Sequence, residues 1–335
     1  MKAIWLEQAG GPDVLRYVDR PDPEPGPGEV RVRLKTAALN RRDTSQRKNA
    51  ASPFPFIPGS DGAGIVDRVG PGVGDLAAGT EVVIFPSLNW FGGEEAPPRD
   101  FQILGGPTDG THAELIVLKR AQIYPKPPPL TWEEAAAIPL AGLTAWRGLF
   151  TRGRLRAGET LLVTGIGGGV ATFALSFGRL AGATVFVTSG DESKLARAAE
   201  LGAAAGINYR ANPAWSADVK KLTGGRGVDL ILDSAGGEVW TECVRALRPG
   251  GRIVGLGMTT GEISPIETRQ VVMRQVDVRG TTMGNAREFE EMLRPYADGR
   301  LRPIVDRVYP LAQIGEGHRR MEEKDQFGKI VLSIS

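Results

Sequence analysis

A run of glycines in the middle of the chain has the clearest chemistry. The segment reads Leu161-Leu-Val-Thr-Gly-Ile-Gly-Gly-Gly-Val-Ala171, so an expected strand leads directly into an expected helix. Glycines at such a turn let backbone N–H groups approach a pyrophosphate, which the positive end of the helix stabilises. The usual G-x-G-x-x-G spacing is incomplete, because Val170 is the sixth position from Gly165. A tight turn without a ligand is the alternative, but the strands and helices that alternate downstream favour dinucleotide binding. The residues assigned to the cofactor here are Gly167, Gly168, Gly169 and Val170.

The residues after the next expected strand bear on which dinucleotide would bind. In the common fingerprint an acidic side chain at this point binds the ribose 2′-OH of NAD. Here the strand ends Val187-Thr188-Ser189-Gly190, so a neutral hydroxyl stands where a carboxylate would repel a 2′-phosphate. Lys194, about a helical turn further on, is either a counter-charge or a solvated helix residue, and the nearby Asp191 weighs against a phosphate. Together with Tyr209, considered below, these residues predict NADPH rather than NADH.

Composition excludes several other kinds of site. The 335 residues include one cysteine, Cys243, and two histidines, His112 and His318, which leaves no cysteine pair for a disulfide and too few Cys/His ligands for zinc. The net charge of +2 gives no electrostatic case for nucleic acid or an anionic membrane. Glu7 interrupts the apolar start of the chain, so we expect no signal peptide, and the free cysteine favours the cytoplasm. We expect Cys243 and His112 to pack in the interior and His318 to lie on a helix surface.

Two kinds of sequence organise the chain. The first 125 or so residues are rich in strand and turn signals, such as the alternating Val30–Leu34. From Thr160 onward, apolar strands alternate with helical segments, which is typical of a parallel sheet covered on both faces. The 19 uncharged residues Thr160–Gly178 could span a bilayer, but their five glycines favour a buried strand, turn and helix. The last 50 or so residues add a helix, Glu288–Tyr296, and a strand, Lys329–Ile334. The predicted fold class is α/β: a β-rich domain and a doubly wound parallel sheet.

Four segments, in order along the chain, resemble one protein family. They are Gly59-Ser-Asp-Gly-Ala-Gly64-Ile-Val, Pro139-Leu-Ala-Gly-Leu-Thr-Ala145, the glycine loop, and Gly224-Gly-Arg-Gly-Val-Asp-Leu-Ile-Leu-Asp-Ser-Ala-Gly236. Together they are similar to the medium-chain dehydrogenase/reductase superfamily. The resemblance implies a GroES-like domain, a Rossmann domain, an active-site cleft between them and a chain that returns to the first domain at its C-terminus. We therefore expect a GroES-like domain of residues 1–125 and 285–335, and a Rossmann domain of residues 126–284.

Many members of this superfamily are zinc alcohol dehydrogenases, and the resemblance locates their ligand positions in this chain. The cysteine position is Asn40, the histidine position is Ser60, and the last ligand position, four before Thr144, is Leu140. Pro86–Gly106, where a structural zinc lobe would carry four cysteines, has none. Neutral Asn, Ser and Leu side chains do not hold Zn²⁺, so no metal is expected. The chain is thus similar to the zinc-independent branch, which includes NADPH-dependent quinone oxidoreductases and enone reductases.

The same resemblance assigns the remaining cofactor residues. Lys194 and Tyr209 match positions that touch the 2′-phosphate in that branch, beside Ser189. Arg41 matches a pyrophosphate contact and Lys329 a basic residue that reaches the cofactor; a surface arginine and a strand-edge lysine are the alternatives. Residues that follow the fourth and fifth strands should also face the cofactor, because the carboxyl ends of parallel strands face the ligand crevice. These are Ser234, Ala235, Leu256, Gly257 and Met258.

Without a metal, hydrogen bonds must activate the electrophile. Hydride transfer to a quinone or an α,β-unsaturated carbonyl fits this requirement, because conjugation spreads the developing negative charge. We expect Asn40 to donate to the substrate oxygen and Thr144 to position the nicotinamide, with Ser45 and Ser60 as further catalytic candidates. Many quinone reductases carry a tyrosine where Ser45 stands, so the sequence identifies no strong proton donor. Asp43 is expected to brace the loop.

Several alternatives stay open at this point. The chain could instead be a metal-free aldehyde or alcohol dehydrogenase-type enzyme, or a non-catalytic NADPH-binding regulatory protein. Trp90 and Phe91 either wall an aromatic substrate pocket or pack the loop that replaces the zinc lobe. The expected partner is a small carbonyl or quinone substrate, with neither nucleic acid nor membrane. Relatives commonly pair edge strands like Asp277–Met283, so a homodimer or homotetramer is expected.

Overall fold

Two stretches far apart in the sequence build the first of two structural units. The computed structural model describes residues 1–93 and 95–334. The first unit joins Met1–Leu143 to Gly284–Ser335, and the second unit is Thr144–Met283. The chain therefore leaves the first unit once and returns to it, as the resemblance implied.

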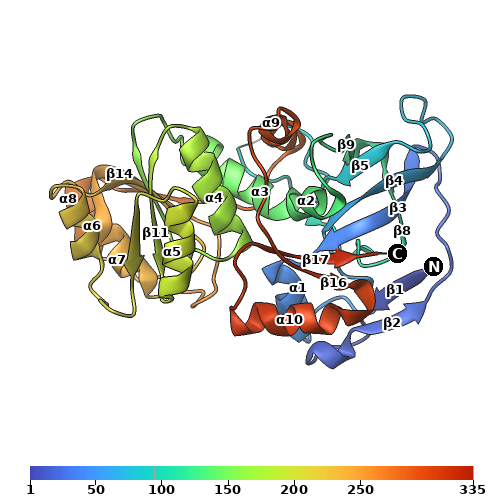
Figure 1. Cartoon of the computed structure of the whole chain (residues 1–335), viewed down its shortest axis with the longest axis horizontal. Helices are drawn as coiled ribbons and strands as arrows, with labels where there is room; N and C mark the ends of the chain where they lie inside the picture. Colours follow the sequence, from blue (N-terminus) through green and yellow to red (C-terminus); the bar gives the residue numbers. More distant parts are fainter. Residues whose placement is uncertain (94, 335) are drawn as a thin grey trace. The chain divides into compact units, whose positions relative to one another are not determined.

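A seven-stranded sheet forms the centre of the first unit (Figure 1). Its strands are β3 (Glu29–Ala38), β4 (Asp61–Val69), β5 (Glu81–Ile84), β8 (Leu115–Lys119), β9 (Ile123–Pro125), β16 (Val305–Pro310) and β17 (Lys329–Ser333). The order is β16-β17-β3-β4-β5-β9, with β8 paired to β3. Only the β16–β17 pair is parallel among these strands. The shorter strands pair as β1 (Lys2–Trp5) with β2 (Arg16–Asp19), and β6 (Ser87–Leu88) with β7 (Gln102–Ile103).

Strand β3 confirms the reading of its alternating sequence. The apolar side chains of Val30–Leu34 are buried in an aliphatic core, and Arg33 between them is exposed. Arg31 departs from the alternation because Asp67 and Glu24 both pair with its guanidinium, and it is buried. A buried charge is tolerated when it is paired in this way.

Four helices belong to the first unit. They are α1 (Arg41–Lys48), α2 (Trp132–Ala137), α9 (Ala286–Ala297) and α10 (Ile314–Glu323), with the 3₁₀ turns Pro12–Val14, Arg120–Gln122 and Leu311–Gln313.

Helix α2 shows where the two units divide. It begins with the expected capping box: Thr131 Oγ1 accepts from the Glu134 N–H at 3.3 Å, and Glu134 Oε2 accepts from the Thr131 N–H at 3.0 Å. It packs against β3, β4 and β17. Residues 126–143 consequently belong with the first unit in the structure, although the proline-rich segment before them favoured a boundary at 125/126. Helix α3 (Pro139–Trp146) runs across the division and continues as a π-helix, Arg147–Arg152.

A six-stranded parallel sheet forms the centre of the second unit (Figure 1). Its strands are β10 (Thr160–Val163), β11 (Thr184–Ser189), β12 (Ala205–Asn208), β13 (Val228–Asp233), β14 (Leu247–Gly255) and β15 (Asp277–Gly280). The order β12-β11-β10-β13-β14-β15 is that of a Rossmann fold, with the chain reversing direction across the sheet between β10 and β13. This confirms the predicted fold class.

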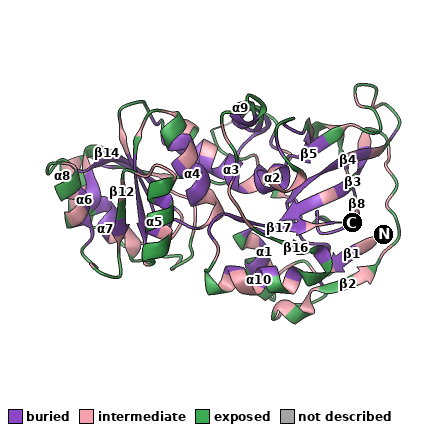
Figure 2. Ribbon diagram, viewed as in Figure 1, coloured by how far each residue is buried: buried purple, intermediate pink, exposed green. Residues whose placement is uncertain are grey.

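Five helices connect these strands, and burial follows the predicted pattern. They are α4 (Gly169–Leu180), α5 (Glu192–Glu200), α6 (Ser216–Leu222), α7 (Val239–Ala246) and α8 (Thr268–Arg274). Every residue of β13 is buried, as expected for a strand covered on both faces. Helix α5, in contrast, is mostly exposed (Figure 2). The uncharged stretch Thr160–Gly178 forms β10, the glycine loop and most of α4. Among the described residues, we find no helix with the length and apolar character needed to cross a bilayer.

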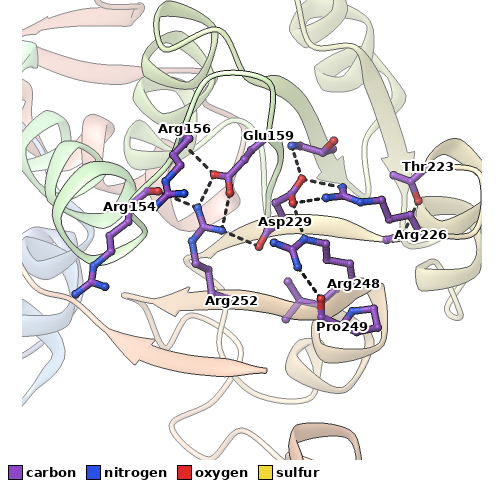
Figure 3. Close-up of polar contacts among 12 residues, drawn as sticks. Arg154, Arg156, Glu159, Thr223, Arg226, Asp229, Arg248, Pro249 and Arg252 are labelled. Atoms are coloured by element: carbon purple, nitrogen blue, oxygen red, sulfur yellow. Dashed lines mark hydrogen bonds and ion pairs between the residues drawn. The ribbon is translucent and has the colours of Figure 1, made fainter. Parts of the chain in front are cut away.

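Charged side chains pair at the amino ends of the parallel strands (Figure 3). The opposite, carboxyl end of β10 leads into the glycine loop. Asp229, near the start of β13, accepts hydrogen bonds from Arg226 Nη2 and Arg248 Nε, both at 2.6 Å. Glu159, just before β10, pairs with Arg252 at 2.5 Å. Burial raises the pKa of Asp229, but the hydrogen bonds from its partners outweigh burial and hold that pKa well below its usual range. These pairs fix the end of the sheet that does not bind ligands in such folds.

Candidate functional site

The glycine loop between β10 and α4 leaves its backbone open. Gly165 has a φ of 67° and Gly167 a φ of 124°, conformations that side chains rarely adopt. Helix α4 begins at Gly169 with Gly168 as N-cap, and no side chain among the described residues caps it. A Cβ built on Gly168 meets no heavy atom within 4 Å. The N–H groups at the start of the helix, including that of Val170, therefore have room for an anionic ligand such as a pyrophosphate.

Asp233 ends β13 and organises the turn that follows it. Its carboxylate accepts hydrogen bonds from Thr164 Oγ1 at 2.6 Å, from the Gly236 N–H at 2.8 Å and from Trp240 Nε1 at 2.7 Å. These bonds hold the loop that contains Ser234 beside the start of the glycine loop. Sequence reasoning missed Asp233, and the available signal was an acidic residue that follows the apolar run Leu230–Leu232 and ends the strand.

The loops after β13 and β14 lie in contact. A Cβ built on Gly257 would come within 2.2 Å of the Ser234 carbonyl oxygen, so only glycine permits this approach. The Leu256 N–H donates to the Asp233 carbonyl at 2.9 Å, and Met258 is exposed. The structure thus brings together the residues expected after the fourth and fifth strands, which are Ser234, Ala235, Leu256, Gly257 and Met258.

Ser189 and Tyr209 lie at the carboxyl ends of adjacent strands. Ser189 pairs in register with Asn208, and Tyr209 follows directly and is exposed. Ser189 Oγ accepts from the Asp191 N–H at 3.1 Å, and Asp191 caps α5 by accepting from the Ser193 N–H at 2.8 Å. The hydrogen bonds from Ser193 lower the pKa of Asp191, so its carboxylate is ionised and is held at the helix start. Ser189 itself brings no charge.

Two basic side chains come from the segments that follow these strands. Lys194 lies in the first turn of α5 and is partly buried. Arg210, which sequence reasoning missed, is exposed and its side chain covers Gly190: a Cβ built there would be 2.7 Å from Arg210 Nε. A basic residue directly after Tyr209 was the signal for it. Arg210 is therefore placed at the strand ends where a 2′-phosphate was expected.

A buried ion pair between Lys329 and Asp61 contacts two of the three residues that match zinc-ligand positions, Asn40 and Leu140. Lys329 Nζ donates to Asp61 Oδ2 at 2.9 Å, to Asn40 Oδ1 at 2.7 Å and to the Leu39 carbonyl at 2.7 Å. Asn40 Nδ2 donates to Asp61 Oδ2 at 2.9 Å, and the Leu140 N–H donates to Asp61 Oδ1 at 2.7 Å. Burial raises the pKa of Asp61, and the ammonium of Lys329 opposes that rise. We call Asn40, Asp61, Leu140 and Lys329 the buried cluster.

These contacts use all the donors that Lys329 has, because an ammonium carries three N–H groups. The geometry within the first unit therefore does not support the expectation that Lys329 contacts the cofactor. Sequence reasoning missed Asp61, although it lies in the quoted Gly59–Gly64 motif beside Ser60.

Ser60 is buried next to the cluster, and Arg42 binds it. Ser60 Oγ donates to the Leu104 carbonyl at 2.7 Å and accepts from Arg42 Nη1 at 2.9 Å. The same Nη1 also donates to the Leu104 carbonyl at 2.9 Å and to the Gly105 carbonyl at 3.2 Å. The hydroxyl proton of Ser60 is thus committed to a backbone acceptor. Arg42 is a further residue that sequence reasoning missed; a second arginine directly after Arg41 was the only signal.

Asp43 braces the start of α1, as expected. Its Oδ2 accepts from the Asn40 N–H at 2.8 Å, and its other oxygen is buried without a hydrogen-bond partner among the described residues. Burial raises the pKa of Asp43, against the opposing charge of Arg42. The carboxyl group therefore favours its neutral form more than an ordinary aspartate does.

The other expected residues are placed as follows. Ser45 is exposed on α1, and its hydroxyl donates to the Arg41 carbonyl at 3.2 Å, so it makes no described contact with the buried cluster. Arg41 is exposed, with Nη1 3.5 Å from the Met321 carbonyl. Thr144 begins the second unit and is buried, and its hydroxyl lies 3.9 Å from Met283 Sδ.

Trp90 and Phe91 have different environments. Trp90 is fully buried and packs edge-on against Phe101, with ring centroids 5.2 Å apart, so it packs the loop. Phe91 is half-exposed and lines an open groove of about 550 Å³ together with Tyr124 and Glu290. Burial raises the pKa of Tyr124 to about 12. This groove includes none of the buried cluster.

The two histidines and the cysteine are all interior residues. Burial lowers the pKa of both His112 and His318 to about 3, so both are neutral at physiological pH. The prediction that His318 lies on a helix surface was wrong, because α10 turns this residue inward, where it is 1% exposed. Cys243 is buried on α7, and burial raises the pKa of its thiol well above the usual value.

The buried cluster does not fit a zinc ion. Among the described residues, no three or more His, Cys, Asp or Glu side chains are grouped to hold a metal. The ammonium of Lys329 already supplies a positive charge to Asn40 and Asp61. A divalent cation placed there would meet this neighbouring cation instead of unpaired donors.

Comparisons with known proteins identify the family of the chain. Residues 26–128 match the family model of the alcohol dehydrogenase GroES-like domain, and residues 169–298 match that of zinc-binding dehydrogenase. A zinc-type alcohol dehydrogenase-like protein of Schizosaccharomyces pombe is 34% identical over 100% of this chain and 99% of its own. The quinone oxidoreductase of Rattus norvegicus is 28% identical over 100% of this chain and 98% of its own.

Solved structures give the same result. A structure described as NAD-dependent alcohol dehydrogenase matches with a TM-score of 0.94 and 42% identity, and each chain is covered completely. A mycobacterial quinone oxidoreductase matches with a TM-score of 0.83 and 26% identity, also with full coverage of both chains. The fold, the glycine loop and the full-length relatives lead to one conclusion: the chain belongs to the medium-chain dehydrogenase/reductase superfamily, as an oxidoreductase of its zinc-independent, quinone oxidoreductase-like kind.

Proposed function

We propose that this protein transfers a hydride from NADPH to a quinone or an α,β-unsaturated carbonyl without a metal. The observation that carries the proposal is the buried cluster. Lys329 and Asp61 neutralise each other beside Asn40 and Leu140, two of the residues that match zinc-ligand positions, so the side chains there leave no ligand set for a metal that would polarise an alcohol or an isolated carbonyl. A conjugated acceptor needs less help, because its developing charge is delocalised.

Residues of the second unit support a bound dinucleotide. The open glycine loop offers its N–H groups to the pyrophosphate, and the loops after β13 and β14 offer their backbone on the same edge of the sheet. When bound, the nicotinamide supplies the hydride, and Thr144 orients its ring in this proposal. Arg41 is proposed to contact the pyrophosphate.

NADPH is proposed because of the residues at the ends of β11 and β12. Ser189 has no charge to repel a 2′-phosphate, and Tyr209, Lys194 and Arg210 come from the neighbouring segments. A phosphate is bound best where cationic groups donate to it. The structure with 42% identity is described as NAD-dependent, so NADH is the coenzyme that the experiment must exclude.

Asn40 is proposed to touch the substrate oxygen. One hydrogen of its amide group is used on Asp61, and the other has no acceptor among the described residues. Because Lys329 holds the amide oxygen, the orientation of the side chain is fixed and the nitrogen is the donor. In this proposal Ser60 supports the site by binding the Leu104 carbonyl, and Ser45 would contact the substrate from the exposed face of α1.

The experiment is an acceptor panel with both coenzymes. Oxidation of NADPH and NADH is followed by absorbance against 1,2- and 1,4-quinones, enones, aldehydes and ketones, with alcohols tested in the reverse direction. The expected result is turnover with quinones or enones and a kcat/KM for NADPH at least about tenfold above that for NADH, the ratio that one charged hydrogen bond typically provides. Turnover only of simple aldehydes or alcohols would favour the alcohol dehydrogenase reading that the names of several relatives suggest. Tight NADPH binding without any turnover would favour a regulatory protein.

A homodimer is also proposed, with β15 as the pairing strand. Strand β15 is at one edge of the parallel sheet and mostly exposed, and in the segment that precedes it Ile263, Val272 and Met273 expose large apolar side chains. An unpaired edge beside apolar side chains is a favourable surface for a second copy. Light scattering coupled to gel filtration should give twice the chain mass. A cytoplasmic location is proposed from the free, buried Cys243.

A further inference from the structure

Arg42, the second residue of α1, carries a positive charge that no carboxylate in the described residues neutralises by contact. Its guanidinium donates only to neutral oxygens: the Ser60 hydroxyl and the carbonyls of Leu104, Gly105 and Gly106. Three buried arginines each pair with a carboxylate, Arg31 with Asp67, Arg47 with Glu322 and Arg252 with Glu159. A desolvated charge without a counter-ion is costly, so the exception calls for an explanation.

Burial lowers the pKa of Arg42, and the charges of Asp43 and Asp61 oppose that lowering without contacting the guanidinium. Asp61 is already paired with Lys329, and Asp43 is bonded to the Asn40 N–H and inclined by burial to its neutral form. Arg274 offers a useful contrast, because it also donates to carbonyls but at the carboxyl end of α7, where the helix dipole is negative. The carbonyls around Arg42 belong to a loop and provide no such dipole.

Part of the guanidinium is left available. Nη1 makes three contacts between 2.9 and 3.2 Å, whereas Nη2 makes one contact at 3.4 Å and Nε has no partner among the described residues. The side chain is only partly covered. Nε and Nη2 are the two nitrogens that can bind one oxygen atom or both oxygens of an anion.

We infer that Arg42 binds the carbonyl oxygen of the acceptor and holds the negative charge that develops on it. The inference rests on the proposed function and names the electrophilic group that the buried cluster lacks. The position of Arg42 supports this inference. Its Nη1 donates to Ser60, which matches a zinc-ligand position and precedes Asp61 in the chain. The positive charge of Arg42 therefore lies beside a residue that matches a metal ligand in zinc relatives.

The electrons and protons of the step balance without a metal. The β-carbon of the acceptor receives a hydride from NADPH, the C=C pair moves to the bond between the α-carbon and the carbonyl carbon, and the carbonyl pair moves onto oxygen. The resulting enolate oxygen pairs with the Arg42 guanidinium. Water then delivers a proton to the α-carbon, which returns the oxygen to a neutral carbonyl. Arg42 keeps its own protons throughout, because a guanidinium stays charged at physiological pH.

A non-reactive anion tests the site apart from turnover. Nitrate is added to the full-length protein at constant ionic strength, balanced with a bulky buffer anion, and two quantities are measured: inhibition against the acceptor and the thermal unfolding midpoint. We expect nitrate to compete with the acceptor and to raise the midpoint of the wild type. Both effects should be absent in Arg42→Gln and present in Arg16→Gln, an exposed arginine used as the control.

The kinetics of the same variants complete the test. Arg42→Gln should lose about 100-fold or more in kcat/KM for the acceptor, the usual cost of removing an oxyanion donor, while the Kd for NADPH from fluorescence stays within about twofold. Arg42→Lys keeps the charge without the planar fork, and should retain part of the activity and of the nitrate effect even if Arg42→Gln fails to fold.

Two outcomes would overturn the inference. The first is an equal effect of nitrate on the wild type and on a folded Arg42→Gln or Arg42→Lys variant. The second is a kcat/KM for the acceptor within about threefold of wild type in either variant, because removing an oxyanion donor should cost far more. Failure of the proposed function is seen separately, as a wild type that turns over no acceptor. In that case a nitrate effect on the unfolding midpoint that depends on Arg42 still establishes the anion site.

Discussion

Lys329 and Asp61 form a buried ion pair of 2.9 Å although 268 residues separate them in the chain. Lys329 begins the last strand of the first unit, and Asp61 begins β4. The pair ties the returning C-terminal segment to the N-terminal part of the same unit. It also joins Asn40 and the Leu140 backbone into one network.

The first prediction concerns this pair. Lys329→Met leaves Asp61 buried without its counter-charge, so we expect the free energy of unfolding to fall by about 3–5 kcal/mol at pH 7. The loss should be smaller near pH 4, because burial raises the pKa of Asp61 and a protonated carboxyl needs no partner. Urea unfolding at both pH values measures this. Lys2→Met, which removes the exposed pair with Asp19, is the control and should change little. A loss that is equal at pH 4 and pH 7 would contradict the account.

A second prediction concerns acid stability and Asp229. The folded-state pKa of Asp229 lies below its unfolded value near 4, so its contribution is complete above that pH and is lost as the pH falls toward the folded value. Asp229→Asn should lower the free energy of unfolding by about 2 kcal/mol at pH 7, as expected for lost charged hydrogen bonds. The gap between wild type and variant should close as the pH is lowered from 5 to 2.

The matched control is Asp277→Asn, since this exposed aspartate pairs with one arginine of the described residues, Arg279. Its stability relative to wild type should be nearly independent of pH. If the gap for Asp229→Asn stays constant down to pH 2, the arginine pairs of Figure 3 are not the source of the pKa shift.

A third prediction concerns the coenzyme. Arg210→Ala should raise the KM for NADPH about tenfold or more and leave the KM for NADH nearly unchanged, because only the 2′-phosphate offers the guanidinium an anion. Steady-state kinetics with each coenzyme at saturating acceptor measure the two values. Lys221→Ala, an exposed lysine on α6, controls for the loss of one positive charge. Equal increases for both coenzymes would show that Arg210 supports the loop and not the phosphate.

The sequence was most informative about elements whose structure is decided by residues close together in the chain. The apolar runs and the glycine loop specified strand, turn and helix from Thr160 to Gly178, because local spacing decides those elements. The capping box at Thr131 was read correctly for the same reason. The domain boundary was harder, since α2 carries a local signal for a helix but no signal for the sheet on which it packs.

The residue types at positions 40, 60 and 140 already argued against zinc, because Asn, Ser and Leu side chains are poor ligands wherever the chain places them. What replaces the metal was decided only by tertiary structure. Lys329, Asp61 and Asn40 become partners through the pairing of β17, β3 and β4, which brings distant segments within hydrogen-bond distance. The role of Arg42 likewise depends on tertiary structure, because the carbonyls of a distant loop bind its guanidinium and no carboxylate of the described residues contacts it. Local sequence fixes which groups a residue carries, whereas burial and the identity of its neighbours decide what its charge can do.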